Sequence, residues 1–155
     1  MSLGAAVAAN PLRLAKRQLQ SGVLAWRRTE DGERLILLLS KRRSKGWGIP
    51  KGKIKAHLSF AENAAKEAFE EAGVKGVLSP TAAAMFRAEK QDPHSARPLV
   101  IEVWVYLLEV TERLPRWPEK AERRIRWVPC EMAAAELKEP ALADLCRRLA
   151  ASKHG

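Results

Sequence analysis

Runs of apolar residues that alternate with polar turns predict several β-strands. The strands expected from this pattern are Gly22–Arg27, Leu35–Leu39, Met85–Ala88, Leu99–Val110 and Arg126–Val128. The first two flank an Asp-Gly turn signal, so they are expected to form a hairpin. The longest run is rich in β-branched and aromatic side chains, as half-buried strands are.

A different periodicity predicts three helices. Ser59 is a candidate N-cap residue with Glu62 three positions later, and the alanine- and glutamate-rich run that follows ends at Gly73. Two further helices are predicted at Glu131–Leu137 and Ala141–Ala151, separated by a proline. Strands mixed with helices predict an α+β fold, with a mixed sheet flanked by helices.

The length of the chain is that of a single domain. Its 155 residues can bury one core, and we expect residues 1–19 to be a partly disordered N-terminal extension and residues 20–155 to be the domain. No uninterrupted apolar run approaches the roughly 18 residues of a membrane-spanning helix, and no signal peptide is evident. A cytoplasmic protein is therefore expected, with its two cysteines, Cys130 and Cys146, as ordinary thiols.

Three glutamates gather on one side of the predicted helix after Ser59. At about 100° per residue, Glu67, Glu70 and Glu71 fall within an arc of roughly 100°, apart from the alanine-rich packing side. Ionised carboxylates this close repel one another, and hard divalent cations such as Mg²⁺ or Mn²⁺ stabilise such clusters. The alternative is a solvated helix face, supported by the (i, i+4) pair of Lys66 and Glu70.

The segment from Gly52 to Val74 resembles the signature of the Nudix hydrolase family. The positions that match are Gly52, Glu67, Glu70, Glu71, Gly73 and Val74, whereas Leu58, Lys66 and Ala68 depart from it. In the family, the first glutamate and the arginine of the signature, here Leu58 and Lys66, mainly brace the loop against the helix. The resemblance extends over residues 20–150 and is strongest to the branch that hydrolyses diphosphoinositol and diadenosine polyphosphates.

This resemblance implies a fold and a reaction. The fold is an α/β/α sandwich with a curved mixed sheet, and the reaction is Mg²⁺-dependent hydrolysis of a phosphoanhydride bond, with Mn²⁺ as a possible substitute. The implied metal ligands are the carbonyl oxygen of Gly52 and the carboxylates of Glu67, Glu70 and Glu71. Either Glu70 or Glu71 is implied to help deprotonate the attacking water, and the sequence leaves that choice open.

Positive charge is concentrated ahead of these carboxylates. The first 55 residues hold 13 Lys and Arg against 3 acidic residues, which accounts for the whole formal net charge of +10. Such a charge would steer a polyanionic substrate towards the site. The candidate phosphate-binding residues are Arg42, Arg43, Lys45, Lys51, Lys53 and Arg124, and the candidate accessory residues are His57 and His94.

Three functions agree with these features. A hydrolase of a small polyphosphorylated substrate, monomeric or homodimeric and without a membrane partner, is the one that the sequence favours. An RNA 5′-end pyrophosphohydrolase is compatible with the basic charge, although no sequence-specific reader of nucleic acid is evident. A non-catalytic relative that binds phosphates or nucleic acid is the third, against which the three retained glutamates argue.

Overall fold

A computed structural model describes residues 16–152 of the chain, so most of the predicted N-terminal extension lies outside the described residues. The strands are β1 (Lys16–Arg28), β2 (Arg34–Ser40), β3 (Trp47–Gly48), β4 (Lys51–Lys53), β5 (Val74–Leu78), β6 (Ala84–Gln91), β7 (Pro98–Arg113) and β8 (Ile125–Pro129). The helices are α3 (Phe60–Ala72), α4 (Cys130–Glu136) and α5 (Pro140–Ala151).

The described strands form one mixed sheet around β1 and β7. These two long strands pair in parallel, from Lys16 opposite Leu99 to Trp26 opposite Glu109. Every other pairing is antiparallel: β2 and β4 on β1, β5 and β6 on β7, and β3 and β8 on β2. The prediction of a mixed sheet is confirmed.

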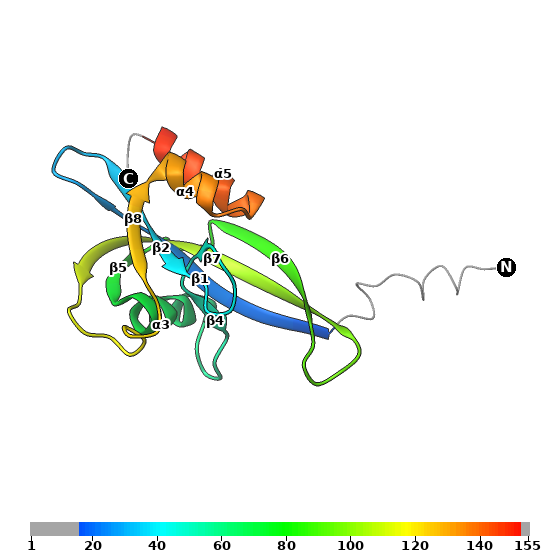
Figure 1. Cartoon of the computed structure of the whole chain (residues 1–155). Coiled ribbons are helices and arrows are strands. Elements are labelled where there is room, and N and C mark those ends of the chain that lie inside the picture. Colours follow the sequence, from blue (N-terminus) through cyan, green and yellow to red (C-terminus); the bar gives the residue numbers. More distant parts are fainter. Residues whose placement is uncertain (1–15, 153–155) are drawn as a thin grey trace.

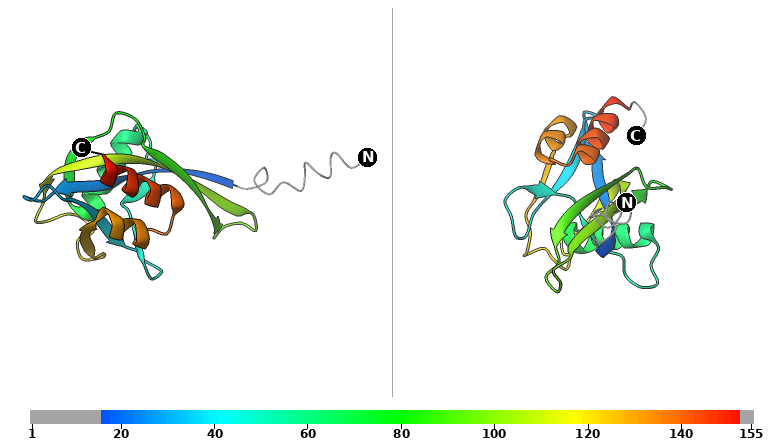
Figure 2. Two further views of the ribbon diagram at one scale, coloured as in Figure 1. Left: turned by 90° about the horizontal axis from the view of Figure 1, so that it is seen from above. Right: turned by 90° about the vertical axis from the view of Figure 1, so that its right-hand side faces the viewer.

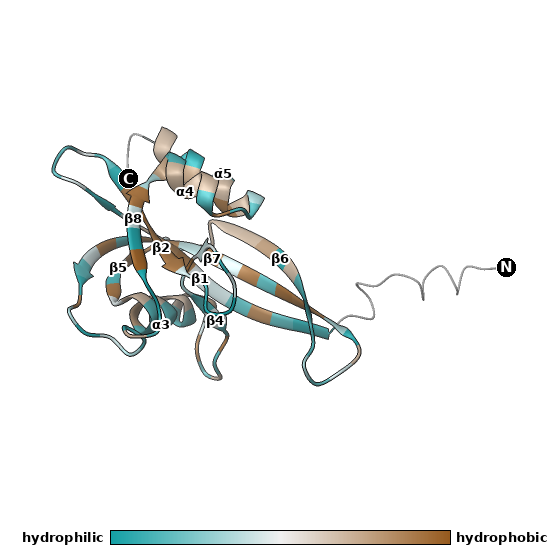
Figure 3. Cartoon of the chain, viewed as in Figure 1, coloured by the Kyte–Doolittle hydropathy of each residue, from teal (hydrophilic) through white to brown (hydrophobic). Residues whose placement is uncertain are grey.

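Helices cover both faces of the sheet, and each face has its own apolar core (Figures 1 and 2). On one face α3 packs its alanines, such as Ala64 and Ala68, against Val23 and Leu108. On the other face α4 and α5 cover a larger core; its buried members include Leu24, Trp26, Val103, Leu142, Leu145 and Cys146. Figure 3 shows the strongly hydrophobic positions mainly on the strands, β2 and β8 among them, and hydrophilic positions in the loops. The predicted three-layer α/β/α architecture is therefore present.

Helix α3 begins and ends where the sequence predicts. The Ser59 side chain accepts a hydrogen bond from the Glu62 amide, and the Glu62 side chain accepts one from the Ser59 amide, which completes a capping box. At the other end Gly73 has a φ of 66°, and a Cβ there would lie 2.3 Å from the Trp117 ring. Glycine is required at this position for both reasons.

The sequence misplaced the start of β1 and missed the shortest strands. Strand β1 begins at Lys16 and not at Gly22. Its first half carries mainly polar side chains, which gave no strand pattern, and pairing with β7 holds it in the sheet. Strands β3, β4 and β5 have few residues and little alternation. Among the described residues, no helix is both long and apolar enough to cross a membrane.

Candidate active site

Glu67 and Glu71 lie one helical turn apart on the same face of α3, and both are buried, with exposed fractions of 5% and 6%. Strand β4 faces them. A Cβ on Gly52 would lie 2.4 Å from the Glu67 carboxyl group, so only glycine allows this close approach. The Lys51 amide donates a hydrogen bond of 3.3 Å to Oε1 of Glu71. The backbone of β4 and the two carboxyl groups thus form one compact site.

Asn63 fixes β4 and the loop that follows it to helix α3. The sequence analysis did not single out this residue. Its side chain is fully buried. Its amide nitrogen donates to the Ser21 hydroxyl (3.0 Å) and the Gly52 carbonyl (3.2 Å), and its oxygen accepts from the Lys55 amide (3.0 Å). Asn63 lies four residues before Glu67, and this spacing on one helical face was the available signal. It joins the loop to the helix in a chain that lacks the usual Glu and Arg of the signature.

The two carboxyl groups have too little positive charge around them. Burial raises the pKa of Glu71 to about 8, the neighbouring Glu67 carboxyl group contributes to the rise, and Arg123 opposes it. Within residues 16–152, Glu71 forms an ion pair only with Arg123, at 3.8 Å, and Glu67 forms none. A cation bound between them would offset this repulsion.

Glu70 has a different partner, because its carboxylate forms an ion pair of 2.9 Å with Lys66. The described part of the chain accordingly contains no group of three acidic, histidine or cysteine side chains arranged to hold a metal. The reason is helical geometry: Glu70 is closer in rotation to Lys66, at (i, i+4), than to Glu67.

The residues that are assembled suit a hard cation. Carboxylate and carbonyl oxygens are the ligands that Mg²⁺ and Mn²⁺ prefer, and the site offers Glu67, Glu71 and the Gly52 carbonyl. Glu70 could join them only after leaving Lys66. Two of the three predicted carboxylates, those of Glu67 and Glu71, thus lie together as possible ligands of such a cation.

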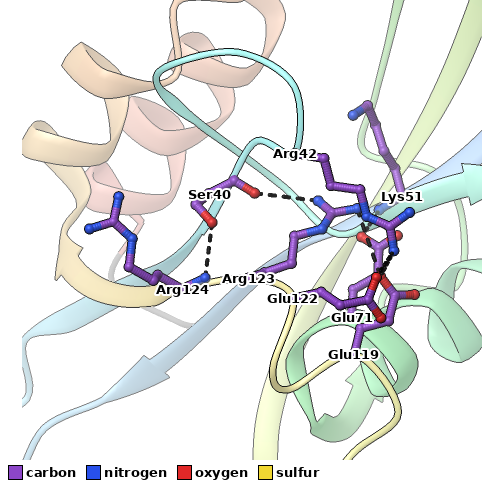
Figure 4. A network of polar contacts seen from close by, with 8 residues as sticks. All are labelled: Ser40, Arg42, Lys51, Glu71, Glu119, Glu122, Arg123 and Arg124. Carbon is purple, nitrogen blue, oxygen red and sulfur yellow. Dashed lines mark hydrogen bonds and ion pairs between the residues drawn. The ribbon is translucent and has the colours of Figure 1, made fainter.

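The candidate phosphate-binding residues are placed in three ways. Lys51 is half-buried beside Glu71, and burial lowers the pKa of its ammonium group in spite of that neighbour. Arg43, Lys45 and Lys53 are exposed. Arg42 donates to Glu119 (2.6 Å) and Glu122 (2.7 Å). The backbone amide of Lys51 thus contacts Glu71, whereas its side chain extends away from that carboxyl group in Figure 4. Its ammonium group forms no ion pair within residues 16–152.

Three arginines in and just after the loop between β7 and β8 have different partners. Arg123 turns towards Glu71, as Figure 4 shows. The guanidinium of Arg124 lies 5.7 Å from the centre of the Trp47 ring, and that of Arg126 lies 5.1 Å from it. The structure places the predicted phosphate ligand Arg124 on this aromatic ring, and the neighbouring Arg123 at the carboxylates.

The two candidate histidines lie outside the carboxylate site. His57 is exposed and has a φ of 70°, the left-handed conformation that glycine adopts most readily. The amide of His94 donates to Asp92 in the loop between β6 and β7. That loop is at the far tip of its hairpin, away from α3 (Figures 1 and 2). The structure brings neither imidazole to Glu67 and Glu71.

A three-layer fold that sets buried carboxyl groups of a helix against a basic, glycine-containing strand is the arrangement that the resemblance to Nudix hydrolases implies. The sequence comparison agrees, since residues 18–149 match the family model of the NUDIX domain. The chain belongs to the Nudix family.

Several known proteins are similar to this chain. Nudix hydrolase 16, mitochondrial, of Arabidopsis thaliana is 30% identical over 110 residues, which cover 70% of this chain and 61% of that protein. Diphosphoinositol polyphosphate phosphohydrolase 2 of Rattus norvegicus is 31% identical over 126 residues, which cover 79% and 65%. The chain thus spans somewhat less than two thirds of either relative.

A solved structure shows the same fold. The C. elegans Ap4A hydrolase, in a binary complex, aligns with a TM-score of 0.62 over 86% of this chain and 96% of its own. The two sequences are 19% identical, so this likeness concerns the architecture alone.

Proposed function

We propose that this chain hydrolyses a phosphoanhydride bond of a small polyphosphorylated substrate, of the diphosphoinositol polyphosphate or dinucleoside polyphosphate kind, with Mg²⁺ as cofactor. The observation that carries the proposal is the pair of buried, under-compensated carboxyl groups of Glu67 and Glu71 against Gly52. The similarity to a diphosphoinositol polyphosphate phosphohydrolase supports the substrate class.

Some residues of the site would bind the cation, and others would bind the phosphates. Glu67, Glu71 and the Gly52 carbonyl would hold the metal, with Glu70 as a further candidate ligand. When bound, such an ion polarises phosphate oxygens and lowers the pKa of water. Lys51, half-buried beside Glu71, would bind a phosphate oxygen as a point charge.

A proton must leave the attacking water, and the acceptor is the carboxylate of Glu70 or Glu71. Asn63 and the Gly52 backbone would keep this reaction centre in one geometry, because the loop is bonded to the helix on which both glutamates lie. Arg43 and Lys45, between β2 and β3, and Lys53, at the end of β4, are exposed and would attract the outer phosphates.

The test is phosphate release from a panel of substrates with and without Mg²⁺. The panel contains diadenosine polyphosphates, diphosphoinositol polyphosphates, nucleoside diphosphate sugars and 5′-triphosphate RNA. Wild type is compared with Glu70→Gln and Glu71→Gln, and Glu131→Gln is the matched control, because Glu131 is exposed on α4 across the sheet. We expect turnover of one of the first two classes, lost in at least one α3 variant and unchanged in the control.

Each other result has a definite meaning. Turnover of the RNA alone would establish the 5′-end activity in place of the proposed one. Binding of polyanions without turnover or metal dependence would indicate a non-catalytic relative. Loss of Mn²⁺ binding in Glu71→Gln but not in Glu70→Gln would assign the metal to Glu71 and leave Glu70 as the proton acceptor.

A further inference from the structure

A chain of alternating charges leads from the carboxyl pair to the surface (Figure 4). It runs from Glu71 to Arg123, then to Glu119, Arg42 and Glu122. These residues come from α3, from the loop between β7 and β8, and from the loop between β2 and β3. The network therefore connects the candidate metal ligand to two loops that border the site.

Arg123 is the loosely bound member of this network. Its side chain is only 16% exposed. Its Nη2 lies 3.8 Å from Glu71 and 3.9 Å from Glu119. Among the described residues its side chain makes one hydrogen bond, a long contact of 3.4 Å to the Ser40 carbonyl. Its Nε has no hydrogen-bond partner within residues 16–152. A guanidinium nearly equidistant from two carboxylates, and beyond hydrogen-bond distance of both, can move to either at small cost.

Glu119 is well placed to receive it. Its backbone amide donates to the Glu70 carbonyl at 2.9 Å, so the residue is fixed to the end of α3. Its carboxylate already holds Arg42 at 2.6 Å, but Arg42 has a second acceptor in Glu122 at 2.7 Å. Glu119 can therefore accept Arg123 while Arg42 stays bound to Glu122.

We propose that Arg123 is a positioning residue that faces the Glu71 carboxyl group in the metal-free protein, and that Glu119 takes its guanidinium when a divalent cation binds Glu71. The inference rests on the metal site of the proposed function. Its physical basis is competition: Arg123 and the cation are both positive and need the same carboxylate, so the cation gains affinity when another carboxylate receives Arg123.

Binding of Mn²⁺ alone, measured by isothermal titration calorimetry, tests this without any substrate. Glu119→Gln leaves Arg123 without its alternative carboxylate, and we expect the Kd of Mn²⁺ to rise roughly threefold to tenfold, the range of couplings in ion networks. Arg123→Met removes the competitor, and the Kd should fall. In the Arg123→Met background, Glu119→Gln should change the Kd by less than about twofold.

Glu112→Gln is the matched control. It removes the same charge from the exposed end of β7, and Glu112 forms no ion pair within residues 16–152. A change below about twofold is expected, since an exposed and more distant charge is screened. An equal rise of Kd in both glutamine variants would show a general charge effect and overturn the proposal. So would an effect of Glu119→Gln that persists without Arg123.

Two further measurements keep the result decisive. Glu71→Gln should abolish the Mn²⁺ signal, which locates the ion, and thermal unfolding shows whether each variant is folded. Should Arg123→Met fail to fold, Arg123→Gln replaces it, because its amide keeps a polar group in the buried position. If wild type binds no Mn²⁺ at Glu71, the inference is wrong, whereas the phosphate-release panel judges the proposed function separately.

Discussion

Two buried glutamates, Glu71 on α3 and Glu102 on β7, have the same side chain and nearly the same exposed fraction, 6% and 5%. Their environments have opposite effects. Burial would raise the pKa of Glu102, but hydrogen bonds from Arg17 (2.7 Å), Arg87 (3.0 Å) and the Trp104 indole (3.0 Å) outweigh it, so the pKa of Glu102 lies below its ordinary value. Burial raises the pKa of Glu71 to about 8.

Compensation, and not burial, therefore accounts for the difference between these two carboxyl groups. Three donors satisfy Glu102, which ties β1, β6 and β7 together. In the part of the chain that the structure describes, Glu71 has one backbone donor and one distant arginine, and it faces a second carboxyl group. A folded protein tolerates such a deficit where a ligand supplies the missing charge.

The sharpest test of this difference is activity. We expect Glu71→Gln to lower phosphate release at least about a hundredfold, the scale of losing a charged group that acts on the reaction centre. Glu102→Gln should change it by less than about threefold, because that carboxylate holds strands and touches no residue of the site. A hundredfold loss of phosphate release in both variants would mean that Glu102 also takes part in the reaction, and the proposed difference between the two glutamates would be wrong.

The loop beside Glu67 is held by hydrogen bonds to Asn63 and not by a counter-ion. Asn63→Ala leaves the Gly52 carbonyl and the Lys55 amide without this partner. We expect unfolding in denaturant to show a loss of about 2 kcal/mol, and turnover to fall about tenfold through misplacement of the loop. Full stability in this variant would mean that water replaces the amide.

At Glu102 the expected effect is on stability. Glu102→Gln would leave Arg17 and Arg87 without their charge partner, and both arginines are more than half exposed, at 60% and 53%. Solvent screening reduces the penalty, so we expect a loss of about 1 kcal/mol. Asp144→Asn, which breaks an exposed pair with Arg148, is the control and should cost less than about 0.5 kcal/mol.

The two glutamates should also respond to pH in opposite ways. The folded protein keeps a proton on Glu71 that the unfolded chain releases near 4.5, so its stability falls as the pH rises from there towards about 8. The lowered pKa of Glu102 gives stability that is present above the ordinary value and is lost as the pH falls through the folded-state value.

Melting temperatures of metal-free wild type, Glu71→Gln and Glu102→Gln between acid and mildly alkaline pH measure this. The advantage of Glu71→Gln over wild type should grow by a few degrees up to about pH 8, and Mg²⁺ should remove it. The disadvantage of Glu102→Gln should vanish in acid. Parallel curves for all three proteins would refute the assignment of opposite pKa shifts.

The sequence predicted what depends on local pattern. The capping box at Ser59 and Glu62, the end of α3 at Gly73 and the two C-terminal helices within a residue or so all follow from short-range preferences. Both glutamates of the carboxyl pair were also predicted, because a helical period places Glu67 and Glu71 on one face.

Features that depend on distant partners could not be predicted. The first half of β1 has no apolar alternation and is a strand because β7 pairs with it. Arg123 reaches Glu71 only because the loop between β7 and β8 lies against α3. The sequence predicted the ion pair of Glu70 with Lys66 only as an alternative to a cluster of three carboxylates around a metal.

His57 offers the smallest test, in the loop between β4 and α3. Its φ of 70° costs an ordinary side chain about 1 kcal/mol or more, whereas glycine carries no such cost but gains freedom in the unfolded chain. We expect His57→Gly to stabilise the protein by about 0.5 kcal/mol in denaturant unfolding, while His57→Ala, which keeps the Cβ, should give no gain. Equal effects of the two variants would show that the imidazole, and not the backbone, determines the energy at this position. Unchanged turnover in His57→Gly would then separate this strained position from the reaction centre that we propose at Glu67 and Glu71.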